Sequence, residues 1–136
     1  MNHRFFNALA VCGVLVLGAV PAAAHHAVAA QYDMDKPGEW SGILKKMEFI
    51  NPHSMLHLEV TNPDGTKTEW VFQTTAVGAL RQRGLARTGP GSLEPGAKYI
   101  VKGFSARNGH PMGFMKTLVF PDGKEVVFWF GDPNGN

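Results

Sequence analysis

The fold is decided by residues 54–84, which read SMLHLEVTNPDGTKTEWVFQTTAVGALRQRG. Apolar and polar residues alternate over 54–61 and again over 66–74, and this two-residue period predicts two β-strands. Between them, residues 62–65 (Asn-Pro-Asp-Gly) predict a tight turn, because these residue types favour turn conformations. In residues 75–83 the period changes to that of a short helix, and the glycine that follows is a typical helix stop.

Four further strand patterns flank this stretch. Gly42 lies near the start of the first and predicts a bulge or a sharp coil, where the missing side chain lets two backbones approach closely. Asn108-Gly109 separates two others and is a favoured two-residue hairpin turn. Thr74 or Thr75 is the expected N-cap of the helix. The four strands are expected at residues 39–50, 97–106, 112–120 and 125–130.

Three strands, a short helix and two or three further strands follow the order of a barrel of the oligonucleotide/oligosaccharide-binding (OB) type. The sequence therefore predicts a mostly β protein, a small five-stranded OB-like barrel with one short helix between strands 3 and 4. A coiled first strand with an early glycine fits this fold, because that strand serves both sheets of the barrel. A small open β-sandwich with one helix is the alternative. The expected core consists of Ile43, Phe49, Leu56, Leu58, Val60, Trp70, Phe72, Leu80, Tyr99, Val101, Leu118 and Phe120.

Residues 1–24 have the three parts of a secretory signal peptide. Arg4 supplies the positive charge, residues 5–20 hold no charged side chain, and Ala22 and Ala24 stand at the −3 and −1 positions of a cleavage site. We therefore expect cleavage after Ala24 and a periplasmic or secreted product that keeps no membrane anchor. An uncleaved anchor is the alternative, since spanning a bilayer takes about 20 residues.

The remaining residues are expected to form an N-terminal arm at 25–38, a barrel domain at 39–130 and a frayed tail at 131–136. The one cysteine of the chain, Cys12, falls inside the predicted signal peptide. The exported product would therefore have neither disulfides nor thiolate ligands. Thirteen basic and eleven acidic residues give a net charge of +2, which argues against nucleic acid as a partner.

Two short histidine motifs are the most specific features of the chain. Ala24-His25-His26-Ala27 follows the predicted signal peptide directly, and Asn51-Pro52-His53-Ser54 ends a strand. With them, the chain resembles a family of small exported bacterial proteins known as a domain of unknown function. Ala27 stands where that family often has serine. The resemblance implies an exported protein with this fold and no particular reaction. Further matching pieces are Tyr32-Asp33, Trp70, Ala79-Leu80, Gly84, Pro95-Gly96, Val101, Gly103 and Pro121-Asp122-Gly123.

Cleavage after Ala24 would leave His25 as the first residue of the mature chain. Its α-amine and imidazole Nδ1 can form one chelate ring, and His26 or His53 can supply a third nitrogen. Nitrogen ligands in a tetragonal plane favour Cu(II) over the other divalent first-row ions. The sequence therefore predicts a copper site formed by His25, His26 and His53. Its affinity should fall in mild acid, because the amine must lose its proton to bind. An inert arm left by signal cleavage is the alternative interpretation of the His25-His26 pair.

The other candidate ligands have simpler interpretations. His53 could be a turn histidine that bonds to the local backbone. His57 is expected to be a solvated or rim residue, and His110 an exposed loop residue. Met112 and Met115 could hold Cu(I) as a pair, although packing in the core or on the surface is favoured.

These features predict a non-enzymatic exported domain that binds copper, for capture or delivery outside the cytoplasm. The first alternative is a metal-free binding or adaptor module that uses the barrel face for a peptide, a glycan or a small molecule. A structural envelope protein and an enzymatic copper centre are further alternatives, and no protein partner is indicated. Five aromatic residues could form a stacking platform for sugars or bases, although strand parity favours the core for most of them. They are Trp40, Trp70, Phe128, Trp129 and Phe130.

Overall fold

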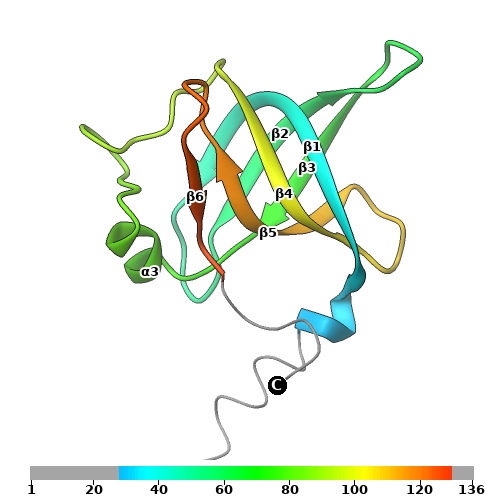
Figure 1. Cartoon of the computed structure of the whole chain (residues 1–136), viewed down its shortest axis with the longest axis horizontal. Coiled ribbons are helices and arrows are strands. Elements are labelled where there is room, and N and C mark those ends of the chain that lie inside the picture. The colour runs from blue at the N-terminus through cyan, green and yellow to red at the C-terminus, as the bar shows by residue number, and fades with distance from the viewer. Residues whose placement is uncertain (1–27, 130–136) are drawn as a thin grey trace, which may run out of the picture.

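Five strands close into a barrel, as the sequence predicts. A computed structural model describes residues 28–129 (Figure 1). Its elements are β1 (Tyr32–Glu48), β2 (Met55–Thr61), β3 (Lys67–Gln73), α3 (Val77–Gln82), β4 (Lys98–Ala106), β5 (Met112–Val119) and β6 (Glu125–Val127). The strands follow the order β3-β2-β1-β4-β5-β6, and parallel pairing of β3 with β5 closes the first five into a barrel. The short strand β6 adds to β5 outside this ring.

The helix predicted between the third and fourth strands is α3. Its first N–H group, that of Val77, donates to the side-chain oxygen of Asn51 at 3.1 Å, so the predicted threonine cap is wrong. Gly84 follows the helix with a φ of 88°, a conformation that glycine adopts at little cost. Leu80 points from α3 into the barrel core. In the described part of the chain, no helix is long and apolar enough to cross a membrane.

β1 begins earlier than the sequence pattern predicts. Tyr32 already pairs with Ala106 of β4, whereas the pattern starts the strand at Glu39. The register shifts between Tyr32 and Pro37, and such a bulge tolerates a proline that cannot donate to the ladder. A short helical segment, residues 28–31, precedes the strand.

A second shift of register changes which residues of β1 face the core. The pairing with β2 joins Leu44 to Leu58 before the shift and Lys46 to His57 after it. Ile43 is therefore 38% exposed, and the prediction that it belongs to the core is wrong. Leu44, which is 1% exposed, is buried in its place.

The barrel core otherwise agrees with the prediction. At Gly42 the backbones of β1 and β2 approach so closely that an added Cβ would lie 2.5 Å from the carbonyl oxygen of Glu59. The predicted core residues that are fully enclosed are Leu56, Leu58, Phe72, Leu80, Tyr99, Val101 and Leu118. Those that pack at the margin, partly buried, are Phe49, Val60, Trp70 and Phe120. The enclosed core also contains Leu44, Leu85, Met115 and Phe128.

A second, smaller apolar cluster lies outside the barrel. Phe114 belongs to it, whereas its neighbour Met115 belongs to the barrel core, and adjacent strand residues point to opposite faces. The ring of Phe114 lies 5.7 Å from that of Tyr32 and 5.3 Å from that of Trp129. This outer cluster therefore joins the start of β1 to the last described residue. Its members are Tyr32, Met34, Phe104 and Phe114, with Val28, Ala29, Ala106 and Trp129 packed around them.

Candidate functional site

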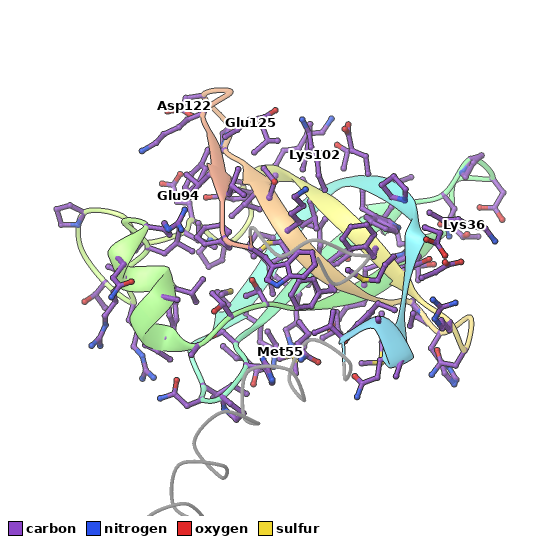
Figure 2. All side chains as sticks on the ribbon, turned by 60° about the horizontal axis from the view of Figure 1, so that its bottom comes forward. Lys36, Met55, Glu94, Lys102, Asp122 and Glu125 are labelled. Carbon is purple, nitrogen blue, oxygen red and sulfur yellow. The ribbon has the colours of Figure 1, made fainter. Side chains whose placement is uncertain are left out.

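A hollow beside the outer cluster brings together segments from both ends of the described chain. It has a volume of about 330 Å³. His53, a predicted copper ligand, lies in its wall. Its position in the chain can be followed in Figure 2 from Met55, the first residue of β2, two positions farther along. The lining residues of this His53 hollow are Val28, Pro52, His53, Thr74, Thr75, Ala76, Phe114 and Trp129.

The turn of residues 49–54 is bonded to the link between β3 and α3. The N–H group of Ser54 donates to the carbonyl of Thr75 at 3.1 Å, and the N–H group of Thr74 donates to the carbonyl of Ser54 at 2.9 Å. Both Ser54 and Thr74 are fully buried. The Thr74 hydroxyl donates to a backbone carbonyl of β5, which explains why it does not cap the helix. These bonds fix the position of His53.

The ring of His53 has a defined orientation. Its Nδ1 lies 3.2 Å from the carbonyl oxygen of Thr74, so the partner is not local to the turn. A carbonyl oxygen only accepts, so Nδ1 carries the hydrogen and a neutral ring keeps its lone pair on Nε2. Metal-bound histidines usually have this arrangement, in which a carbonyl fixes the tautomer and the ring orientation. Among residues 28–129, no hydrogen-bond partner of Nε2 is found.

The other two predicted ligands, His25 and His26, lie outside the described residues. Val28, three positions after His25, lines the His53 hollow. Within residues 28–129, no group of three histidine, cysteine, aspartate or glutamate side chains is placed to hold a metal ion.

The remaining described histidines lie away from this hollow. His57 is more enclosed than expected, because its side chain is only 13% exposed. Its Nε2 lies 2.8 Å from Glu48 and its Nδ1 lies 2.8 Å from Glu69. His110 is exposed in the loop before β5, as predicted. Strand parity could have indicated this pairing, because His57, Glu48 and Glu69 all have outward positions on neighbouring strands.

Met112 and Met115 do not form a Cu(I) pair. Met112 is exposed at the start of β5, whereas Met115 is fully buried inside the barrel. Residues three positions apart in a strand point to opposite faces, so the two sulfur atoms diverge. The packing interpretation of Met115 is confirmed.

The aromatic residues form separate groups rather than one stacking platform. Trp40 and Trp70 pack against each other with ring centroids 5.1 Å apart, at the margin of the barrel core. Trp129 belongs to the outer cluster, and Phe128 is buried in the barrel core. Phe130 lies outside the described residues.

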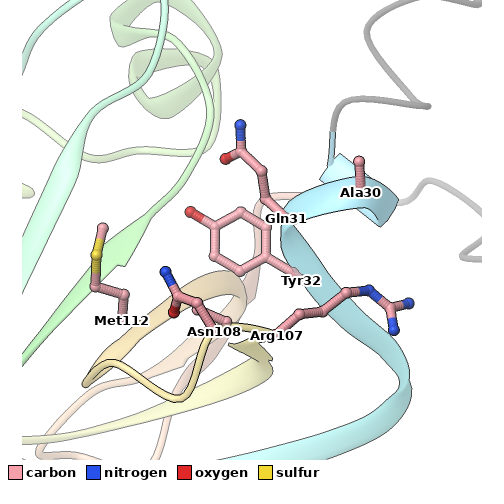
Figure 3. A pocket seen from close by; sticks show the side chains of 7 residues that line it. Ala30, Gln31, Tyr32, Arg107, Asn108 and Met112 are labelled. Carbon is pink, nitrogen blue, oxygen red and sulfur yellow. The ribbon is translucent and has the colours of Figure 1, made fainter.

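A second hollow, of about 320 Å³, opens where β1 begins (Figure 3). The hydroxyl of Tyr32 donates to the side-chain oxygen of Gln73 at 3.0 Å, and burial raises the pKa of Tyr32. Arg107 donates to the carbonyl of Ala29 at 3.0 Å and so holds the helical segment in place. The strand pattern did not predict this hollow, because it starts β1 only at Glu39.

Comparison with known families identifies the family of the chain. The sequence model of "Family of unknown function (DUF6152)" matches residues 13–115, so the chain belongs to this family. The match includes both histidine motifs, and membership confirms the resemblance to a domain of unknown function. No curated protein matches the chain.

Proposed function

We propose that the exported, mature protein binds Cu(II) through His25, with His53 as the third nitrogen ligand and His26 as its competitor. The α-amine and Nδ1 of His25 would form a chelate ring, and Nε2 of His53 would complete the set. One observation carries the proposal: Val28 and His53 line the same hollow. The chain therefore enters the described structure beside a histidine whose ring is oriented as a ligand.

The covalent chain limits how far the N-terminus can lie from His53. Val28 lies three positions after His25, and an extended chain spans at most about 3.3–3.6 Å per residue, or roughly 11 Å in total. Val28 is itself part of the wall of the hollow. A short connection also keeps the entropic cost of closing the chelate low.

The surroundings of His53 suit a metal ligand. The bond from Nδ1 to Thr74 leaves Nε2 as the basic nitrogen of the neutral ring. Phe114 and Trp129 provide apolar walls, and an apolar shell limits access of water to a bound ion. Three nitrogen ligands from an amine and two imidazoles match the preference of Cu(II).

The role that we propose is copper capture or delivery outside the cytoplasm. It combines the copper site with the signal peptide predicted at residues 1–24 and a periplasmic or secreted location. Apart from His53, the described residues that line the hollow carry no ionisable side chain. His53 is therefore the one titratable group among the described lining residues, and its oriented ring suits a metal ligand.

A metal-free function is the second candidate, in which the His53 hollow takes a small apolar ligand. The walls formed by Val28, Phe114 and Trp129 favour it, since ligand sites are mostly apolar with a few polar groups. In this case His53 would orient the ligand by one hydrogen bond.

Copper binding by protein that begins with His25, confirmed by intact mass, tests the proposal. We expect tight one-to-one binding of Cu(II), a nitrogen-rich EPR spectrum and weaker binding in mild acid. A variant with three extra alanines before His25 keeps every side chain but moves the amine away from His25 and leaves no histidine among its first three residues, so it should lose the EPR signature. His53→Gln should lose at least the roughly 10- to 100-fold in affinity that removal of a supporting partner costs. His110→Gln is the matched control and should bind like the parent.

Each outcome assigns the site differently. Equal, weak binding by the parent and the extended variant would refute the N-terminal chelate and favour the small-ligand alternative. Quenching of tryptophan fluorescence by apolar compounds would then be measured, with Trp129→Phe as the control. Loss of binding in the extended variant alone, with His53→Gln unaffected, would make His26 the third ligand.

A further inference from the structure

His57 is held between two carboxylates from different strands. It lies on β2, with its Nε2 2.8 Å from Oε1 of Glu48 at the end of β1. Its Nδ1 lies 2.8 Å from Oε1 of Glu69 in β3. The ring faces outward, since the neighbouring residues Leu56 and Leu58 point into the core. The His57 side chain is nevertheless only 13% exposed.

Both contacts are hydrogen bonds only when the imidazole carries two hydrogens. A carboxylate accepts and does not donate, so each ring nitrogen must act as a donor. The ring is then an imidazolium, and its bonds to carboxylates are charge-assisted. A neutral ring has one N–H group, and its other nitrogen would turn a lone pair toward a carboxylate oxygen at the same distance.

Other charges on this face support the ionised state of the carboxylates. Lys46 lies 2.5 Å from Glu48, and its hydrogen bond lowers the pKa of that carboxyl. Farther along, Glu59 pairs with Lys67 at 2.7 Å and with Lys45 at 3.5 Å. The hydrogen bond from Lys67 lowers the pKa of Glu59. His57 therefore faces Glu48, a carboxylate whose charged form is favoured, in a row of paired charges.

We propose that His57 is a proton-dependent clasp across β1, β2 and β3. In its protonated form it joins Glu48 to Glu69, and deprotonation as the pH rises releases at least one of them. The clasp closes beside the turn of residues 49–54, because Glu48 is the last residue of β1. It stabilises the folded protein in mild acid relative to neutral pH, with or without copper.

Urea unfolding of the full chain between about pH 5.5 and 7.5, the range in which imidazoles titrate, tests the clasp. EDTA keeps the protein metal-free. His57→Gln is neutral throughout this range, and His110→Gln removes an exposed loop histidine as the matched control. From low to high pH, the unfolding equilibrium constant of the parent should rise about 1.4- to 5-fold relative to that of His57→Gln, the range for exposed ion pairs. His110→Gln should follow the parent, and Glu69→Gln should show a smaller rise.

An independent measurement on the unmodified protein guards against a folding defect in the variants. Nitrogen NMR of the His57 ring at about pH 6 should show two protonated nitrogens. The clasp is refuted if His57→Gln keeps the full pH dependence of the parent. It is also refuted if the His57 ring is found with one protonated nitrogen at that pH.

Discussion

Replacing Leu44 and Ile43 by alanine, one at a time, tests the register of β1. The shift between Leu44 and Lys46 places Leu44 inside the barrel at 1% exposure and leaves Ile43 outside at 38%. In a strand without this bulge, Ile43 would face the core and Leu44 would face outward. Each substitution removes three carbon atoms, so a difference in cost reports the environment and not the number of atoms.

The expected cost of the two variants differs severalfold. Three buried carbons contribute about 2.4 kcal/mol at ~0.8 kcal/mol each, and the cavity left behind raises the cost of a core Leu→Ala change to about 3–5 kcal/mol. We therefore expect Leu44→Ala to lose about 3 kcal/mol of unfolding free energy. Ile43→Ala loses packing only on the outer face, together with some β propensity, and should cost about 1 kcal/mol.

Urea unfolding followed by tryptophan fluorescence measures this difference. With a dependence on urea of roughly 1–2 kcal/mol/M, a gap of about 2 kcal/mol separates the two midpoints by about 1–2 M. Leu44→Met keeps the volume of the side chain and should cost less than about 1.5 kcal/mol. Equal midpoints, or a lower midpoint for Ile43→Ala, would show that the bulge is misplaced.

Three further predictions concern the cap, one carboxylate and the metal. Asn51→Ala removes the acceptor of the Val77 N–H group and should cost about 0.5–2 kcal/mol in urea unfolding; Asn51→Asp is the control, and an unchanged midpoint would contradict the cap. Lys46→Ala removes the hydrogen bond that lowers the pKa of Glu48, so carboxyl NMR should show this pKa moving up toward its ordinary value. A carboxyl whose pKa is lowered by folding stabilises the folded state at higher pH, and this stabilisation is lost as the pH falls. The unfolding free energy of Lys46→Ala should therefore fall less on acidification than that of the parent. Identical titration of Glu48 in both proteins would contradict the pairing. Cu(II) at about 100 times its Kd should stabilise protein that begins with His25 by about 2.7 kcal/mol, reversibly with EDTA, whereas equal stabilisation of the alanine-extended variant would place the copper elsewhere.

The strands and helix within residues 54–84 could be predicted because their periodic patterns are long and local. β2, β3 and α3 lie where alternation and the change of period place them. β1 could be predicted only in part, because each bulge shifts the side-chain parity by one residue. The bulges are set by pairing with β4 and β2, and the local pattern of β1 does not show where this pairing shifts. An unbulged pattern therefore places Ile43 in the core, where the structure places Leu44.

The loop between β4 and β5 shows how tertiary context overrides a local turn signal. Asn108-Gly109 predicts a two-residue hairpin, which requires positive φ at both positions. The strands instead end at Ala106 and resume at Met112. Gly109 has a φ of 76°, and among the described residues no non-glycine has a positive φ. The longer loop also lets the N–H group of Val71 in β3 bond to a loop carbonyl, a contact that closes the barrel.

The sequence could predict which residue types form the candidate site but not where in the fold they meet. A histidine after proline at a strand end identifies His53, but its partner Thr74 follows another strand. The hollow exists because the turn after β1, the link before α3, β5 and both ends of the described chain meet there. This meeting depends on barrel closure and on the packing of Trp129 against Phe114, neither of which has a local sequence signal.

The roles proposed for His53 and His57 require opposite protonation states of the imidazole. A copper site at His25 and His53 needs a free amine and a neutral imidazole, so acid weakens it. The clasp at His57 needs an imidazolium, so acid strengthens it. His53 precedes β2 in the chain and His57 lies within it, and their partners differ: a backbone carbonyl for His53 and two carboxylates for His57. We therefore expect mild acid to weaken copper binding at the proposed site while it strengthens the proposed clasp at His57, so that metal release does not require unfolding.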